Sequence, residues 1–351
     1  MTVIPGLLLA LVLAFAGHYL SELIGIDLMG LPKSPISAIM MAIILGIIIR
    51  NTFTLPDSLQ PGIRFGLVRV LRIGIVLLGI RLSLSQAGTI GLQALPVIIG
   101  AVAAALIIVS YLARRLGLSG KLGTLIAVGT SICGATAIVA TAPTIAAKDD
   151  EVAYSVACIT LFGVIAMLVY PFVGHWIFDG DAFRAGMFLG TSVHETAQVA
   201  GSGLVYQQYY EDPQALDVAT VTKLVRNLGM LLVIPLMSIL YHRNHSDGTE
   251  APKWYTMIPL FVIGFAIMSM IRTVGDMSEQ PFGLFTVDQW NEVVGYTKKT
   301  AEWCLGVAMA AVGLGTSIKG LKDIGLRPLG AGLVAAVLVG GVSIGLISLL
   351  Y

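Results

Sequence analysis

The sequence predicts an all-α polytopic membrane protein with about 11 transmembrane helices, and its composition is the first reason. Of its 351 residues, 56% are hydrophobic and 12% are charged, and its mean hydropathy is +0.89. Soluble domains carry about 25% charged residues. Apolar segments long enough to cross a bilayer, which takes about 20 residues, recur along the whole chain. The alternating segments typical of a transmembrane β-barrel do not appear in it.

Each apolar segment, taken in order, is one predicted span, and loop residues such as Pro, Gly, Asp and Lys set its ends. The predicted spans cover about 4–20, 36–50, 65–82, 92–113, 121–146, 152–177, 183–206, 216–241, 255–272, 300–319 and 329–350. The first span imitates a signal peptide but has no basic segment before it, so we interpret it as a retained helix. Because no long linker divides the chain, we expect a single transmembrane transporter domain over residues 1–351.

A repeated motif is the second reason for the predicted fold. GTSICG at 129–134 and GTSIKG at 315–320 are identical at five of six positions, and a third version, GTSVHETAQ, occupies 190–198. The first two motifs lie in the fourth spans of two five-span sets, over about 36–177 and 183–351. Because five is odd, the second set enters the membrane from the opposite side, which is the plan of an inverted repeat.

The repeated motif predicts two broken, crossing helices. Gly, Thr and Ser are weak helix formers, and Ser and Thr hydroxyls compete for backbone partners. Irregular backbone inside a membrane must be buried in protein or line a cavity, and the N–H groups at helix N-termini suit an anion. Close packing of helices through small residues is the alternative interpretation. The predicted substrate cradle consists of Gly129, Thr130, Ser131, Gly134, Gly315, Thr316 and Ser317.

Ionisable residues inside the predicted spans are the second group of candidates, because such residues are costly in a membrane. His194, Glu195 and Gln198 lie in the seventh span, and Lys223 and Arg226 share one face of the eighth. Lys223 and Arg226 are expected to pair with Glu195 or to bind an anionic substrate; snorkelling is the alternative. For Glu195 we weigh a structural ion pair against a substrate or proton-coupling role. The segment HETAQ has Gln where the zinc motif HExxH has its second His, so no metal site is predicted.

Other polar residues receive structural interpretations. Arg81, at the end of the third span, is expected to be an interfacial anchor, and Lys319 either joins the site or anchors its helix. Four residues are placed at the interface without a role: His18, His175, Glu302 and Trp303. Three cysteines without paired spacing are interpreted as small buried hydrophobes: Cys133, Cys158 and Cys304.

Lysine and arginine are unequally shared between the two faces of the predicted topology. One face collects Arg50, Arg64, Arg69, Arg72, Arg114, Arg115, Lys121, Arg184, Arg243, Lys253, Lys319, Lys322 and Arg327. The other face collects fewer, namely Lys33, Arg81, Lys148, Arg272, Lys298 and Lys299. The positive-inside rule then places the N-terminus in the cytoplasm and the C-terminus outside.

Four stretches together resemble one known family. GTSICGATAIVATAP, TSVHETAQVAGSG, KLVRNLGMLLVIP and AMAAVGLGTSIKGLKDIGLRPL occur in this order, with GIRLSLSQ at 79–86 before them. They are similar to the YeiH-like family of bacterial inner-membrane proteins, a family assigned to sulfate export. The resemblance covers nearly the whole chain. It implies the fold of sodium/proton antiporters and bile-acid symporters, with two inverted five-helix repeats and crossed, broken helices. The family's VHExAQ motif maps onto Val193, His194, Glu195, Ala197 and Gln198.

We therefore expect a secondary transporter of a small anion, sulfate or a related sulfur oxyanion or sulfonate, coupled to H⁺ or Na⁺. Glu195 would accept a proton that offsets the charge of the substrate. The alternative is a cation exchanger or an anion channel. Two further hypotheses come from other classes of protein: a receptor, and an intramembrane enzyme that uses Ser192 and His194. The chain has no nucleotide-binding motif and a net charge of +1, so no cofactor, nucleic acid or enzymatic activity is expected. A homodimer is left open.

Overall fold

The computed structural model describes residues 3–28, 34, 36–242, 259–317 and 326–351, and these residues form helices and loops without a strand. The chain divides into two compact units. Unit 1 comprises Met1–Ile90, Ala200–Asp217 and Leu260–Ile318, and unit 2 comprises Gly91–Val199, Val218–Pro259 and Lys319–Tyr351.

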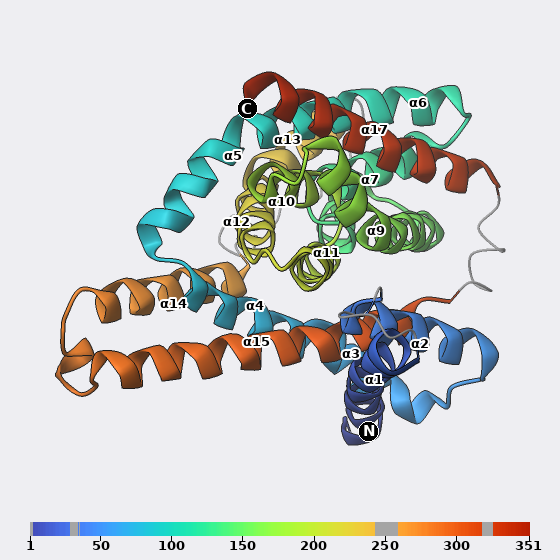
Figure 1. Ribbon diagram of the computed structural model, residues 1–351. Coiled ribbons are helices and arrows are strands. Elements are labelled where there is room, and N and C mark those ends of the chain that lie inside the picture. Colours follow the sequence, from blue (N-terminus) through green and yellow to red (C-terminus); the bar gives the residue numbers. More distant parts are fainter. Residues whose placement is uncertain (1–2, 29–33, 35, 243–258, 318–325) are drawn as a thin grey trace. The chain divides into compact units, whose positions relative to one another are not determined.

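The helices of unit 1 pack around one long helix. They are α1 (Ile4–Glu22), α2 (Ala38–Thr52), α3 (Gln60–Phe65), α4 (Leu71–Leu78), α14 (Leu260–Asp276) and α15 (Val287–Gly315). α15 contacts α1, α2 and α4, and α14 lies along α4 (Figure 1). Small residues allow this close packing, since a Cβ atom at Gly46 of α2 would lie 2.7 Å from the carbonyl oxygen of Ala310 in α15.

The helices of unit 2 surround the motif at 129–134. They are α6 (Ser110–Arg115), α7 (Gly120–Ser131), α8 (Ala135–Thr141), α9 (Asp149–Ile177), α10 (Ala182–Ser192), α13 (Met230–His242) and α17 (Leu326–Leu350). α9 contacts α7, α8, α10 and α17 (Figure 1). The remaining helices each begin in one unit and end in the other: α5 (Leu84–Ala104), α11 (Thr196–Tyr210) and α12 (Gln214–Leu228).

Among the residues that the structure describes, helix covers most of each predicted span, with differences at several ends. The predicted bounds of the span 300–319 are corrected, because the helix there, α15, begins at Val287 and ends at Gly315. The predicted spans 183–206 and 216–241 are each interrupted, the first after Ser192 and the second at Gly229. Residues 243–253 of the predicted loop 242–253 and residues 318–320 of the second motif lie outside the described residues, as do Lys33, Arg243, Lys253, Lys319 and Lys322.

Length and hydropathy identify membrane-crossing candidates directly. Among the described residues, five helical stretches are long and apolar enough to cross a bilayer: Ile4–Leu28, Leu84–Arg115, Asp149–Ile177, Gln214–Met237 and Pro328–Leu350. Shorter apolar helices cover Ala38–Thr52 and Ala135–Ile145. The chain is therefore a multi-pass helical membrane protein, while the predicted number of spans, the inverted repeat and the orientation of the termini stay predictions.

Candidate functional site

The first feature of the site is a helix interruption at GTSICG, as the sequence predicts. α7 ends at Ser131, and Ile132 leaves the helical region with φ −119° and ψ −89°. Gly134 then takes φ +68°, a conformation that L residues with a side chain rarely adopt, and α8 begins at Ala135. The backbone carbonyls at the end of α7 consequently lack the partners that a continuous helix would provide.

A second interruption occurs at GTSVHE, inside the predicted span 183–206, which the sequence predicts to be one unbroken helix. α10 ends at Ser192, Val193 is extended with φ −78° and ψ 138°, and α11 begins at Thr196. The side chain of Ser192 donates to the carbonyl oxygen of Phe188 at 2.5 Å, and that of Thr191 to the carbonyl oxygen of Met187 at 2.8 Å. Such bonds compete with the helical pattern. Both interruptions lie in unit 2.

Lys223 of α12 binds the backbone at both interruptions. Its side chain is fully buried, and its Nζ atom donates to the carbonyl oxygens of Ile132 at 2.8 Å, of Val193 at 3.0 Å, and of His194. An ammonium group has three donors, so each has an acceptor here. The positive charge meets the partly negative C-terminal ends of α7 and α10, where a cation is favourable.

Arg226 lies one turn further along α12 and binds carbonyl oxygens in the last turns of α7 and α10. Its Nε atom donates to Ser131 at 2.7 Å and its Nη1 atom to Thr191 at 2.6 Å, and both acceptors are backbone carbonyl oxygens. Further bonds reach the carbonyl oxygens of Thr130, Gly190 and Val193. The planar guanidinium group presents donors in several directions, and it therefore joins the ends of two half-helices that are far apart in sequence.

The expected ion pair between these cations and Glu195 is absent from unit 2 as the structure describes it. Both cations instead bind carbonyl oxygens, and they are too deeply buried to snorkel. The carboxylate of Glu195 is half-buried and accepts a hydrogen bond from the hydroxyl of Thr160 at 3.0 Å. Glu195 also precedes α11, where its backbone N–H donates to the Oε1 atom of Gln198 at 3.1 Å, half of a capping box.

Several polar groups at this place have no partner among the described residues. The hydroxyls of Thr130 and Thr222, both ring nitrogens of His194 and the Oδ1 atom of Asn227 are buried without a hydrogen bond. Buried polar atoms without a partner are rare in native proteins. Donors and acceptors therefore remain available beside the two cations. The hydroxyl of Ser131, by contrast, already donates to the carbonyl oxygen of Val128 at 3.0 Å.

The described part of the second copy of the motif, residues 315–317, lies in unit 1 and begins at a helix end. α15 ends at Gly315, the hydroxyl of Thr316 donates to the carbonyl oxygen of Val312 at 2.8 Å, and Asn51 binds the carbonyl oxygen of Thr316 at 3.0 Å. Ser317 is half-buried. The structure thus groups Gly129, Thr130, Ser131, Gly134, His194, Glu195, Gln198, Lys223 and Arg226 in one unit. A cradle that also includes Gly315, Thr316 and Ser317 stays a prediction.

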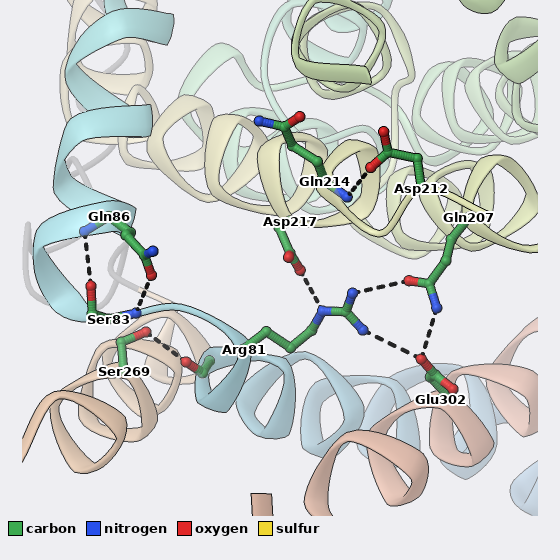
Figure 2. Close-up of polar contacts among 10 residues, drawn as sticks. Arg81, Ser83, Gln86, Gln207, Asp212, Gln214, Asp217, Ser269 and Glu302 are labelled. Carbon is green, nitrogen blue, oxygen red and sulfur yellow. Dashed lines mark hydrogen bonds and ion pairs between the residues drawn. The ribbon is translucent and has the colours of Figure 1, made fainter. Parts of the chain in front are cut away.

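Arg81 has a different role from the interfacial anchor that the sequence suggests. Its side chain is only 6% exposed; it forms ion pairs with Asp217 at 2.5 Å and Glu302 at 3.3 Å and donates to Gln207 at 3.1 Å (Figure 2). Gln207 in turn donates to Glu302 at 3.0 Å. This cluster joins the 3-10 turn η4 (Gly79–Arg81), which follows α4, to α11, α12 and α15 within unit 1. The sequence does hold a signal for this cluster: Arg81, Asp217 and Glu302 each lie near an end of a predicted span.

The structure defines a multi-pass helical membrane protein in which two buried cations bind the ends of two interrupted helices. Comparison with known proteins gives the family: residues 5–332 match the family described as conserved hypothetical protein 698, to which the chain belongs. The resemblance to the YeiH-like family is thereby confirmed.

The relatives carry names that describe only a membrane location. A UPF0324 membrane protein of Streptococcus pyogenes serotype M18 is 34% identical over 90% of this chain and 88% of its own. Similar proteins of Fusobacterium nucleatum and Nitratidesulfovibrio vulgaris are 33% and 30% identical, over 82% and 92% of this chain and 82% and 86% of their own. No solved structure matches the chain.

Proposed function

We propose that this protein is a secondary transporter of small anions in the bacterial inner membrane, working by alternating access. The observation that carries the proposal is the surplus positive charge at the interrupted helices of unit 2. Lys223 and Arg226 are both buried there and bind backbone carbonyl oxygens, while the carboxylate of Glu195 binds the hydroxyl of Thr160. In a low-dielectric interior such charges act over longer distances than in water, so an anion is attracted to this place.

The unpartnered groups suit a small oxyanion. The hydroxyls of Thr130 and Thr222 supply donors, and a ring nitrogen of His194 supplies another. An oxyanion with several acceptor oxygens satisfies groups of this kind without a metal. Sulfate, a related sulfur oxyanion or a sulfonate is the substrate class we propose, in agreement with the assignment of the YeiH-like family.

Proton coupling follows from the position of Glu195. Its carboxylate lies at the same place and repels an anion as long as it is ionised. Protonation removes that repulsion, so binding of the anion and binding of a proton at Glu195 are expected to support each other. A proton gradient can then drive movement of the anion.

Thermal unfolding of the purified protein with a panel of ligands tests the proposal. The panel contains sulfate, sulfite, thiosulfate, taurine, isethionate and dicarboxylates. A ligand at about 100 times its Kd adds roughly 2.7 kcal/mol to stability, so the Tm rises selectively with the substrate. Thr130→Val removes an unpartnered hydroxyl and should abolish this rise without loss of basal stability.

Thr124→Val is the matched control on the same helix. The hydroxyl of Thr124 already donates to the carbonyl oxygen of Gly120 at 2.8 Å, so the rise in Tm with the anion should persist. A panel in which no anion raises the Tm of the wild-type protein would contradict the proposal. A response to Na⁺ or pH alone would instead support the alternative of a cation exchanger.

A further inference from the structure

The backbone around Lys223 has the composition of a cation site. Three carbonyl oxygens from two separate chain segments, those of Ile132, Val193 and His194, converge on the Nζ atom. These residues directly follow the C-terminal ends of α7 and α10, where the helix dipole is negative. In transporters with discontinuous helices, unwound carbonyls and half-helix C-termini coordinate the coupling Na⁺.

We propose that the ammonium group of Lys223 is a tethered cation in the place where such transporters bind Na⁺, so that this protein binds no sodium there. The transport consequence, a cycle that needs no sodium gradient, rests on the proposed function. The binding statement does not, because it concerns only the carbonyls and the cation that they hold.

Two further observations support this assignment. Arg226 binds the carbonyl oxygens of Thr130, Ser131 and Thr191, so the carbonyls left without helical partners at the ends of α7 and α10 are already bound to a fixed positive charge. The residue at the point of convergence is a lysine, whose compact ammonium resembles a monovalent metal ion more closely than a planar guanidinium does. A mobile cation would have to displace a covalently attached one.

Removal of the ammonium should therefore create a sodium site. Lys223→Ala leaves three carbonyl oxygens directed at a space that the side chain has vacated, and a small cation can enter it. We expect the Tm of Lys223→Ala to fall below that of the wild-type protein. Sodium or methylammonium should then raise it in a concentration-dependent manner, whereas choline at equal ionic strength should not. The Tm of the wild-type protein should be the same in sodium and in choline.

Lys121→Ala is the matched control. Lys121 also donates to a backbone carbonyl oxygen, that of Ala146 at 2.5 Å, but from an exposed position. Its loss should produce no difference between sodium and choline. Lys223→Arg retains a positive charge but places a larger, planar group at the carbonyls, and it should likewise remain insensitive to sodium.

Two results would overturn the proposal. One is a rise in the Tm of the wild-type protein that is specific to sodium, a measurement that needs no variant to fold. The other is a folded Lys223→Ala protein that does not distinguish sodium or methylammonium from choline. Failure of the transporter proposal can be told apart from failure of this one. If the protein binds no anion but sodium still raises the Tm of Lys223→Ala, the transporter proposal fails and the tethered-cation proposal stands.

Discussion

At the scale of single residues, the position of Glu195 depends on a glycine in the opposite interruption. Gly134 has φ +68°, and a Cβ atom built on it would lie 2.5 Å from the Cγ atom of Glu195. The carboxyl group can approach the start of α8 only because position 134 has no side chain. Thr160, on α9, then fixes one carboxylate oxygen by a hydrogen bond of 3.0 Å. Three separate segments thus place one acid beside the cations.

Glu195→Gln tests whether this acid carries the coupled proton. The amide oxygen of Gln can accept the same hydrogen bond from Thr160, so we expect the fold to persist and anion binding to be retained. Uptake of the anion into proteoliposomes should no longer respond to an imposed pH gradient, because Gln cannot release a proton. Glu151→Gln, at an exposed helix start, is the control and should leave the response intact. A normal gradient response in Glu195→Gln would exclude Glu195 as the coupling group.

At the scale of elements, the two interruptions and α12 form one structural unit. The guanidinium of Arg226 reaches the ends of α7 and α10 simultaneously, and Lys223 reaches the residues that follow them. Helix termini buried without partners are unfavourable. The interrupted helices and the cationic face of α12 therefore require each other.

Arg226→Lys should destabilise the protein although it conserves the charge. A lysine cannot present the planar set of donors that bridges two helix ends, so buried carbonyls lose their partners at about 1–3 kcal/mol each. We expect a clear fall in Tm in thermal unfolding. Arg114→Lys is the control, because the Nε atom of Arg114 also donates to a carbonyl oxygen, that of Ser110, from an exposed position. Equal Tm changes in the two variants would contradict the bridging role.

Local sequence predicted the interruption at 129–134 but not the one at 190–196, for a physical reason. In the first motif, Gly134 has a backbone conformation that favours glycine, and such a signal is local. In the second, the residues after Ser192 are Val, His and Glu, and the extended backbone at Val193 depends on bonds to Lys223 and Arg226 from a distant helix. The same long-range contacts explain why both cations bind carbonyls rather than Glu195. Hydropathy located the helical segments well, since burial in lipid is a property of whole segments.

At the scale of the whole molecule, α12 belongs to both units. Its first turn carries Asp217, which binds Arg81 in unit 1, and its later turns carry Lys223 and Arg226, which bind the interrupted helices of unit 2. The Arg81 cluster joins the beginning of α12 to the turn η4 (Gly79–Arg81), α11 and α15 (Figure 2). The first turn of α12 is therefore held by side-chain contacts of unit 1.

A double-mutant cycle on Arg81 and Asp217 measures how strongly this end of α12 is held. The two side chains are 6% and 17% exposed, and removal of one partner from a buried pair costs about 3–5 kcal/mol because the other charge stays unpaired. Arg81→Gln and Asp217→Asn should each lower the free energy of unfolding, and the double variant should lose less than the sum, with a coupling energy of about 0.5–3 kcal/mol.

Arg184 and Asp181 provide the control cycle. They form an ion pair at 3.1 Å in which both side chains are 39% exposed, and pairs so accessible to solvent contribute about 0–1 kcal/mol. Additive effects of Arg81→Gln and Asp217→Asn would show that α12 is not held through this pair. Coupling in the Arg81–Asp217 cycle, together with a lower anion uptake rate and unchanged anion binding in the double variant, would show that the pair supports transport without being part of the anion site.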